Sequence, residues 1–157
     1  MSFSKEMALK VVFGDNEFYH NNTIFHLIAE LNCPEILDRF WNNTTDEQEF
    51  KQHLQLKNTN GETCLHVAAK QQRGCCAERI IAQMFDMGAD LNAQEDGTGN
   101  TILHIAVKNK DYELVEYLLE QSSSRNIENN DRLTPYQLAE QDNDLEIMDI
   151  FSKPLED

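Results

Sequence analysis

Three histidines stand at the same place in similar short segments, and their side chains are the best suited to chemistry in this chain. His26, His66 and His104 each follow a threonine by three residues. Imidazole can bind zinc or transfer protons near neutral pH. A catalytic or metal site brings different residues together at one place, whereas these histidines recur in register along the chain. The recurrence therefore favours a structural role, in which each imidazole hydrogen-bonds to an adjacent turn.

Cysteines and short catalytic motifs give no support to a metal site or an enzyme. Cys64 lies two residues before His66, and Cys75 and Cys76 are adjacent, but structural zinc sites usually combine closely spaced cysteine pairs with closely spaced histidine pairs. The sequence has no glycine-rich phosphate loop, G-x-S-x-G or HExxH motif, and the stretch 96–99 is too short for a dinucleotide fingerprint. We therefore expect no catalytic, cofactor-binding or metal-binding residues, and we expect the four cysteines to stay reduced.

The segments that carry the histidines are copies of one unit. Thr63-Cys-Leu-His66 is followed by Thr101-Ile-Leu-His104, and weaker copies lie at Thr23-Ile-Phe-His26 and Thr134-Pro-Tyr-Gln137. This threonine turn resembles the ankyrin repeat, whose period is about 33 residues. The resemblance implies an all-α solenoid of helical hairpins, an architecture that points towards protein binding rather than catalysis.

The spacing of the copies supports four repeats with two insertions. Thr101 and Thr134 are 33 residues apart, whereas the two earlier intervals are 38 and 40 residues. The apolar cluster of each second helix lies at a constant distance from its threonine except in the second unit, which places four extra residues between the helices, around 71–77. Seven extra residues follow the second helix of the first unit, around 44–51. We expect both insertions to be connections, because loop-closure entropy grows slowly with length.

We therefore expect one ankyrin-repeat domain over residues 1–157, with repeats at about 21–57, 58–95, 96–128 and 129–157. The first 20 residues include the stretch Ser4–Phe13, which predicts an amphipathic N-terminal capping helix over the first repeat; a partner-binding peptide is the alternative. Each threonine is expected to cap a first helix, and acidic residues are expected to open the second helices. Those acidic residues are Glu35, Glu78, Asp111 with Glu113, and Glu146.

The charge is strongly acidic and unevenly distributed. The chain has 28 acidic and 13 basic residues, a net charge of −15. From Asp111 to the C-terminus there are 13 acidic residues against three basic ones, a net charge of −10 over 47 residues. Such a field opposes binding to nucleic acid and to anionic membranes, and it favours a basic protein partner. The plainer alternative is that acidic residues only keep the protein in solution.

Length and hydropathy predict a single domain of ordinary size. The 157 residues contain no apolar run of 18 residues, which a membrane-spanning helix would need. The first residues show no basic segment followed by an apolar stretch, so we expect no secretory signal. The prediction is an intracellular, unsecreted monomer.

A closer resemblance covers roughly residues 58–140. The stretches that carry it are Asn60–Ala69, Gly88–Glu95 with the lengthened hairpin after it, Thr101–Val107 and Thr134–Ala139. They resemble the later ankyrin repeats of the IκB family, the inhibitors of Rel/NF-κB transcription factors. The resemblance implies that the protein binds Rel/NF-κB subunits.

The chain departs from the long members of that family. Those members carry more repeats and an Asp-Ser-Gly-x-x-Ser phosphorylation signal for degradation, and no such motif occurs in these 157 residues. A short chain without the signal resembles the viral IκB-like ankyrin proteins of polydnaviruses. This resemblance implies a viral protein of the host cytoplasm and nucleus, which suppresses NF-κB-dependent immunity and which host signalling does not remove.

The predicted contact surface consists of the hairpin tips before the threonine turns, together with exposed positions on the first helices. The tip residues are Asn58, Asn60, Glu62, Glu95, Asp96, Thr98, Asn129, Asn130 and Arg132. The acidic C-terminal half is expected to oppose or occupy the basic DNA-binding surface of a Rel protein, so the predicted mechanism is a block of DNA binding. The alternative is a non-Rel ankyrin adaptor that binds another host protein.

Overall fold

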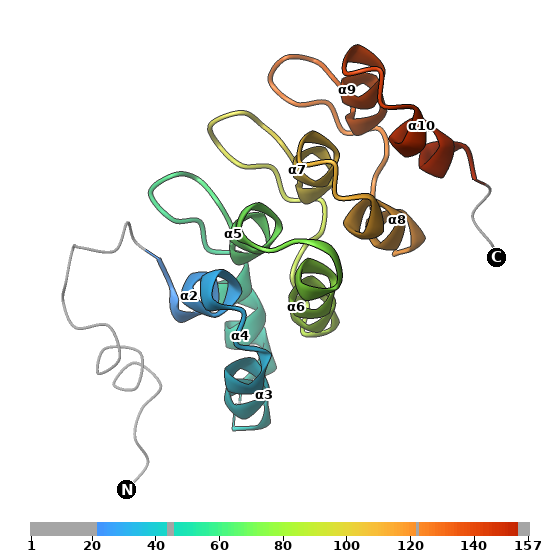
Figure 1. Cartoon of the computed structure of the whole chain (residues 1–157). Helices are drawn as coiled ribbons and strands as arrows, with labels where there is room; N and C mark the ends of the chain where they lie inside the picture. The colour runs from blue at the N-terminus through green and yellow to red at the C-terminus, as the bar shows by residue number, and fades with distance from the viewer. Residues whose placement is uncertain (1–21, 44–45, 122, 154–157) are drawn as a thin grey trace, which may run out of the picture.

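The chain forms a stack of helical hairpins (Figure 1). The computed structural model describes residues 22–43, 46–121 and 123–153. Nine helices lie in these ranges, and no strand occurs in them. The helices are α2 (Ile24–Leu31), α3 (Pro34–Asn42), α4 (Glu47–Leu54), α5 (Cys64–Gln71), α6 (Gly74–Asp86), α7 (Ile102–Lys108), α8 (Tyr112–Glu120), α9 (Pro135–Gln141) and α10 (Leu145–Ser152).

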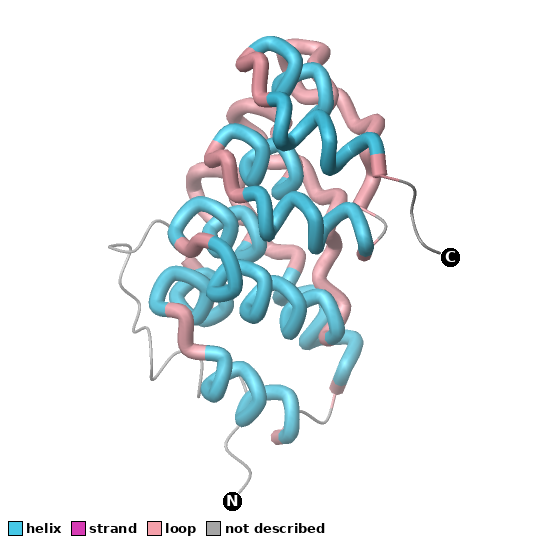
Figure 2. Tube along the Cα trace, turned by 45° about the vertical axis from the view of Figure 1, so that its right-hand side comes forward, coloured by secondary structure: helices cyan, strands magenta, loops and turns pink. Residues whose placement is uncertain are grey.

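Each repeat places an inner helix against an outer helix, and a long loop then leads to the next repeat. The inner helices α2, α5, α7 and α9 pack side by side, and so do the outer helices α3, α6, α8 and α10. The loops before α5, α7 and α9 project from one edge of the stack (Figure 1 and Figure 2). We call their tips the first finger (58–62), the middle finger (95–100) and the last finger (129–133). The arrangement confirms the predicted all-α ankyrin solenoid.

The core is a continuous apolar layer between the two rows of helices. Its largest fully buried side chains are Ile28, Leu37, Leu54, Leu65, Ile80, Ile81, Met84, Ile102, Leu103, Leu114, Leu118 and Ile147. Ala68, Ala106 and Ala139 are completely buried on the inner helices, where a small side chain lets neighbouring helices approach closely. A single hairpin cannot bury its own apolar face, so each repeat depends on its neighbours for stability.

The insertion after the first repeat is a helix, and the prediction of a plain connection at 44–51 was wrong. Helix α4 begins after Asp46, whose carboxylate accepts the backbone N–H groups of Gln48 and Glu49, both at 3.0 Å. Phe50 and Leu54, four residues apart, lie on one face of this helix and are buried. Their burial supplies the apolar contact that a short isolated helix lacks.

The insertion in the second repeat is also helical, and it does not lie between the helices. Helix α6 has 13 residues, whereas α3 and α8 have nine each, so the four extra residues add one turn at its start. Glu78 therefore lies inside α6, and the expectation that it opens the helix was wrong. Instead, the Gly74 N–H donates to both carboxylate oxygens of Asp111 from the next repeat, at 3.1 and 3.0 Å.

The other acidic residues predicted at helix starts are found there. Glu35 and Glu146 lie in the first turns of α3 and α10, and Asp111 caps α8 by accepting the Leu114 N–H at 3.3 Å. The predicted capping helix at Ser4–Phe13, within residues 1–20, falls outside the described residues. Among the helices that the structure describes, none is long and apolar enough to cross a membrane.

Candidate protein-interaction surface

Three buried histidines join each threonine turn to the finger of the following repeat. In each case Nδ1 accepts the backbone N–H of the threonine three residues earlier, at 3.1 to 3.2 Å. The opposite ring nitrogen, Nε2, faces a carbonyl oxygen of the next finger. The Nε2–oxygen distances are 2.8 Å from His26 to Glu62, 3.0 Å from His66 to Asn100 and 3.0 Å from His104 to Leu133.

This arrangement assigns one neutral tautomer to all three rings. Because Nδ1 accepts a backbone N–H, the ring hydrogen must be on Nε2, from which it is donated to the carbonyl oxygen. Burial lowers the pKa of His26, His66 and His104 below the ordinary histidine value, although the carbonyl acceptors act in the opposite direction. Each ring therefore hydrogen-bonds to an adjacent turn, as its recurrence predicted. In the described ranges there is no cluster of three metal-ligating side chains.

The fourth unit has glutamine where the others have histidine. Gln137 Oε1 accepts the Thr134 N–H at 2.9 Å, and the Gln137 N–H donates to the threonine hydroxyl at 3.3 Å. The local turn is thus closed in the same way without an aromatic ring. The turn that leads from the threonine into the inner helix needs only an acceptor at this position. The second nitrogen of histidine makes the additional link to the next repeat.

Each finger is a tight turn held by hydrogen bonds within the finger. The Asn58 side-chain oxygen accepts the backbone N–H groups of Asn60 and Glu62, both at 3.0 Å. Asn129 repeats the arrangement in the last finger, at 3.0 and 3.1 Å. In the middle finger, the Gly99 N–H donates to the Glu95 carbonyl oxygen at 3.0 Å.

Backbone hydrogen bonds also join each finger to the next. The Asp96 N–H donates to the Gly61 carbonyl oxygen at 3.1 Å, and the Asn130 N–H donates to the Thr98 carbonyl oxygen at 2.9 Å. The Lys57 ammonium adds an ion pair with Asp96 at 2.5 Å. The three tips therefore form one connected ridge, whose shape is set before a partner arrives. A partner that binds a preformed ridge loses less conformational entropy than one that must order three loops.

Lys70, a partly exposed residue near the end of α5, links the first and middle fingers, a role that sequence reasoning missed. Its ammonium lies 2.7 Å from a carboxylate oxygen of Glu62 and 2.5 Å from one of Glu95. Burial alone would raise the pKa of both carboxyl groups, but the hydrogen bonds from Lys70 lower it below the ordinary value. Nothing in the sequence marks this contact, because Glu62 and Glu95 meet only when two repeats stack.

The nine predicted contact residues divide into two groups. Asn58, Glu62, Glu95 and Asn129 are buried and hold the turns together, so their side chains face the interior of the fingers. The exposed residues are Asn60, Asp96, Thr98, Asn130 and Arg132. Their role in binding a partner stays a prediction, and these five are the ones placed to make contact.

The acidic C-terminal half surrounds the end of the stack with exposed carboxylates. Nine of its 11 described acidic residues are exposed, and the other two, Asp111 and Asp144, are buried helix caps. Of the exposed ones, Glu116 is paired with Lys153 at 2.7 Å. The exposed residues are Glu113, Glu116, Glu120, Glu128, Asp131, Glu140, Asp142, Glu146 and Asp149.

Comparison with known proteins agrees with this architecture. One family model, described as ankyrin repeat, matches residues 60–96, and another, described as ankyrin repeats (many copies), matches residues 86–139. The I-Kappa-B like protein N3 of Microplitis demolitor bracovirus (isolate Webb) is 39% identical over 118 residues, which are 75% of this chain and 71% of that protein. The chain belongs to the IκB-like ankyrin-repeat family. The resemblance to polydnavirus members of that family is thereby confirmed.

Further relatives extend from the viral proteins to insects. The I-kappa-B like protein N2 of the same virus is 34% identical over 139 residues, covering 87% of this chain and 74% of that protein. The NF-kappa-B inhibitor cactus of Drosophila melanogaster is 28% identical over 145 residues, and the match spans 28% of its length. Among solved structures, the ankyrin repeat domain of Bcl-3 superposes with a TM-score of 0.71 at 24% identity, over 82% of this chain and 54% of that one. The last likeness concerns the fold.

Proposed function

We propose that this IκB-like chain binds host Rel/NF-κB transcription factors, blocks their DNA binding and thereby suppresses the immune response. The family supports an inhibitor, since a relative carries the name NF-kappa-B inhibitor. The observation that carries the proposal is the preformed ridge of three fingers beside a strongly acidic last pair of repeats. The ridge supplies a shaped contact surface, and the carboxylates supply a field that a basic surface recognises.

The mechanism follows from the position of the charges. A DNA-binding surface is basic because it neutralises phosphates. The nine exposed carboxylates of the C-terminal half are flanked by few cations, so they repel DNA and attract the surface that DNA would occupy. Competition with DNA is therefore the step at which this chain acts.

The test is a gel shift with the Rel homology domain of an insect NF-κB protein, a κB-site duplex and increasing amounts of the chain. Neutralising Glu120 and Glu140 (E120Q/E140Q) should weaken the competition several-fold at low salt. The matched control is E30Q/E47Q, which removes two exposed carboxylates from the first repeat and from α4. The difference between the two variants should shrink at high salt, because screening removes surface attraction.

The outcomes separate the parts of the proposal. Binding of the Rel domain without loss of the DNA complex would keep the partner and reject the mechanism. Equal competition by the two double variants would reject the role of the acidic half. No binding at all would reject the Rel partner.

The proposal also includes action inside the host cell, in the cytoplasm and nucleus, and persistence during immune signalling. Both are tested by following the tagged chain in stimulated insect immune cells. Secretion of the chain, or its loss at the same rate as the cell's own inhibitor, would contradict this part.

A further inference from the structure

Arg132 occupies a backbone position that the other two fingers give to glycine. Two residues before the threonine turn, the first finger has Gly61 with φ +74° and the middle finger has Gly99 with φ +69°. The last finger has Arg132 with φ +59° at the same place. This left-handed conformation is unfavourable for a residue with a Cβ atom and natural for glycine. The turn nevertheless imposes it, because the Arg132 N–H donates to the Asn129 carbonyl oxygen at 2.9 Å.

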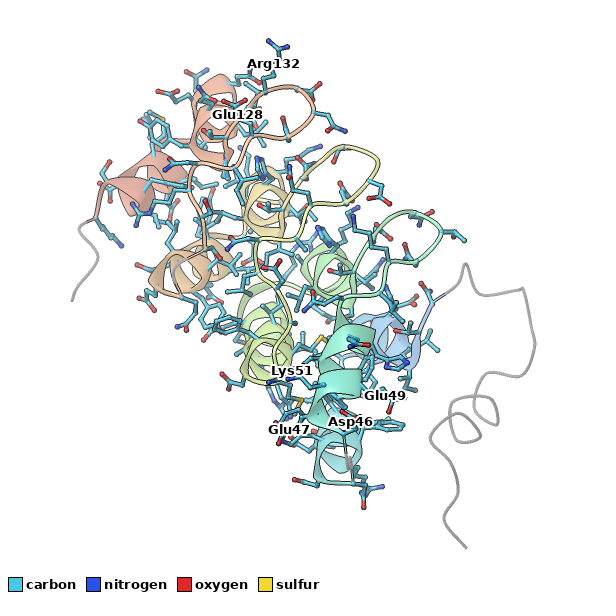
Figure 3. The ribbon with its side chains drawn as sticks, turned by 180° about the vertical axis from the view of Figure 1, so that it is seen from behind. Asp46, Glu47, Glu49, Lys51, Glu128 and Arg132 are labelled. Atoms are coloured by element: carbon cyan, nitrogen blue, oxygen red, sulfur yellow. The ribbon has the colours of Figure 1, made fainter. Side chains whose placement is uncertain are left out.

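The strained arginine makes no compensating side-chain contact in the described part of the chain. The other four exposed residues of the predicted contact set each make one: the Asn60 side chain bonds to Glu62, Asp96 to Lys57, Thr98 to Glu95, and Asn130 to the Gly97 carbonyl oxygen. Within residues 22–43, 46–121 and 123–153 the Arg132 guanidinium has no such partner, and Figure 3 shows it at the end of the last finger, directed away from the helices.

Lys110 is a second basic residue with a left-handed backbone conformation, and it offers a comparison for Arg132. Lys110 has φ +55° in the turn between α7 and α8, and its ammonium lies 3.6 Å from the Asp144 carboxylate. The corresponding turns between α2 and α3 and between α9 and α10 have Asn32 and Asn143, with φ +51° and +52°. Asparagine tolerates this conformation. Lys110 therefore has an internal partner, whereas Arg132 has none among the residues that the structure describes.

We propose that Arg132 contacts the bound protein partner and forms a bidentate, charge-assisted pair with a carboxylate of that partner. The inference rests on the proposed function and adds the chemistry of one contact to it. Strain that persists without an internal contact is characteristic of residues that act on a ligand. The planar guanidinium fork matches the two oxygens of a carboxylate.

The charge of its surroundings gives this contact a specific task. Arg132 follows exposed Asp131 in the chain, and the last two repeats carry the other exposed acidic residues of the C-terminal half. A basic partner surface can lie against those carboxylates in several registers, but one cation among them accepts only the register that brings an acidic side chain opposite. Arg132 thus selects the docking position, a role that electrostatic complementarity commonly has in interfaces.

The test compares binding and stability for a set of variants at position 132. R132G should weaken binding to the Rel homology domain by roughly tenfold, as expected for loss of a hydrogen bond to a charged group. Its melting temperature should be unchanged or up to about 4 °C higher, because glycine relieves the strain. R132N, which tolerates the same conformation without charge, should bind as weakly as R132G. R132K should bind with intermediate affinity, since it keeps the charge and loses the fork.

The matched control is K110N, which removes one positive charge from another left-handed position at the far end of α7 and should leave affinity unchanged. Titration calorimetry gives affinity, and thermal unfolding gives stability. Wild-type affinity in R132G and R132N would overturn the inference while the proposed function stands. A lower melting temperature in R132G would show that Arg132 stabilises the folded chain, and it would overturn the inference as well. Failure of the wild-type chain to bind the Rel domain would overturn the proposed function, and the inference with it.

Discussion

Each buried histidine acts as a neutral ring with one accepting and one donating nitrogen. A proton added to Nδ1 would meet the threonine N–H that this atom accepts, and it would place a charge in the interior of the stack. Histidine therefore serves the fold only while it is neutral. The same geometry makes folding sensitive to pH near the point where free imidazole titrates.

The first prediction concerns this pH dependence. The pKa values of His26, His66 and His104 are lowered in the folded chain, so below the ordinary value near 6.5 the unfolded chain binds protons that the folded chain does not. The free energy of unfolding should then fall as pH decreases from about 7 to 5, by at most about 1.4 kcal/mol per pH unit for each histidine. Urea titrations at a series of fixed pH values measure this free energy of unfolding.

A control separates the histidines from the carboxylates. Glu62 and Glu95, whose pKa values are lowered, stabilise the fold above the ordinary glutamate pKa and lose that effect only at more acidic pH. H104Q keeps an acceptor for the Thr101 N–H, as Gln137 does for Thr134, and removes one titrating ring. Its stability should depend less steeply on pH between 7 and 5. If the unfolding free energy of H104Q depended on pH as steeply as that of wild type, the His104 ring would not be a cause of the pH dependence.

At the scale of residues, the sequence predicted the contacts that recur from repeat to repeat and missed the contacts that occur only once. The four threonines lie at the N-caps of the inner helices as expected, and they and the three histidines could be predicted because the copies repeat one pattern. The bridge from Lys70 could not, because it depends on the distance between two fingers in the stack. The signal for Arg132 was present as an arginine aligned with two glycines, and it becomes interpretable only with the φ angles of the folded chain.

At the scale of elements, α4 is the main departure from a regular stack. The Phe50 ring lies 5.0 Å from the Phe25 ring and 5.1 Å from the Trp41 ring, both in edge-to-face contact. Figure 3 shows α4 packed on the side of the stack opposite to the view of Figure 1, with its acidic start at Asp46 and Glu47. The helix thus connects the first inner and outer helices through one aromatic cluster.

The second prediction tests whether α4 belongs to the folding unit. F50A should lower the free energy of unfolding by about 3 to 5 kcal/mol, because it removes a buried aromatic side chain and its ring contacts. The fluorescence of Trp41, the chain's one tryptophan, reports the change locally in a denaturant titration. Q52A, at an exposed position of the same helix, is the control and should change stability by less than about 0.5 kcal/mol. A similar small effect of F50A would show that α4 is a detachable connection.

Arithmetic found the right stretches of sequence for both insertions, near 44–51 and 71–77, but it assigned both the wrong structure and placed the second one between helices instead of inside α6. The period of the repeat counts residues and carries no information on their conformation. A closer look at 46–54 would have found an aspartate cap followed by Phe50 and Leu54 at helical spacing, which is a usable signal. The added turn of α6 has no comparable marker, because its start is held by Asp111 of another repeat.

At the scale of the whole molecule, stability is carried by contacts between neighbouring repeats. Lys70 contributes one such contact, since it joins two carboxylates that belong to successive fingers. The side chains of Glu62 and Glu95 are 12% and 6% exposed. Removal of Lys70 would therefore leave two carboxylates unpaired and poorly solvated. In a one-dimensional stack, weakening one interface reduces cooperativity as well as stability.

The third prediction follows from this coupling. K70M should lower the free energy of unfolding by about 1 to 2 kcal/mol, a range reduced because the lysine is about one-third exposed. It should also broaden the denaturant transition. K108M, at the same position of the next repeat and exposed, is the control and should behave as wild type. Equal effects of the two substitutions would exclude the bridge as a link between repeats.

The repeat number, the helical class and the uneven charge could all be predicted from the sequence, because each is a sum over many residues. The division of the nine finger residues into buried and exposed groups could not, because both groups are polar and both occur in turns. Asn58 and Asn60 illustrate this, since one holds the turn and the other faces solvent. Only the hydrogen-bond geometry distinguishes them.

The hydrogen bonds that join neighbouring fingers are made by backbone atoms, and this affects how the sequences of IκB-like proteins can diverge. An N–H or carbonyl group is present whatever side chain a position carries, so substitutions at the exposed tips leave the Gly61–Asp96 and Thr98–Asn130 connections in place. Related chains can then differ at these tips and still keep the ridge. One virus carries several IκB-like relatives of this chain, and we expect their tip residues to differ more than the residues that hold the turns.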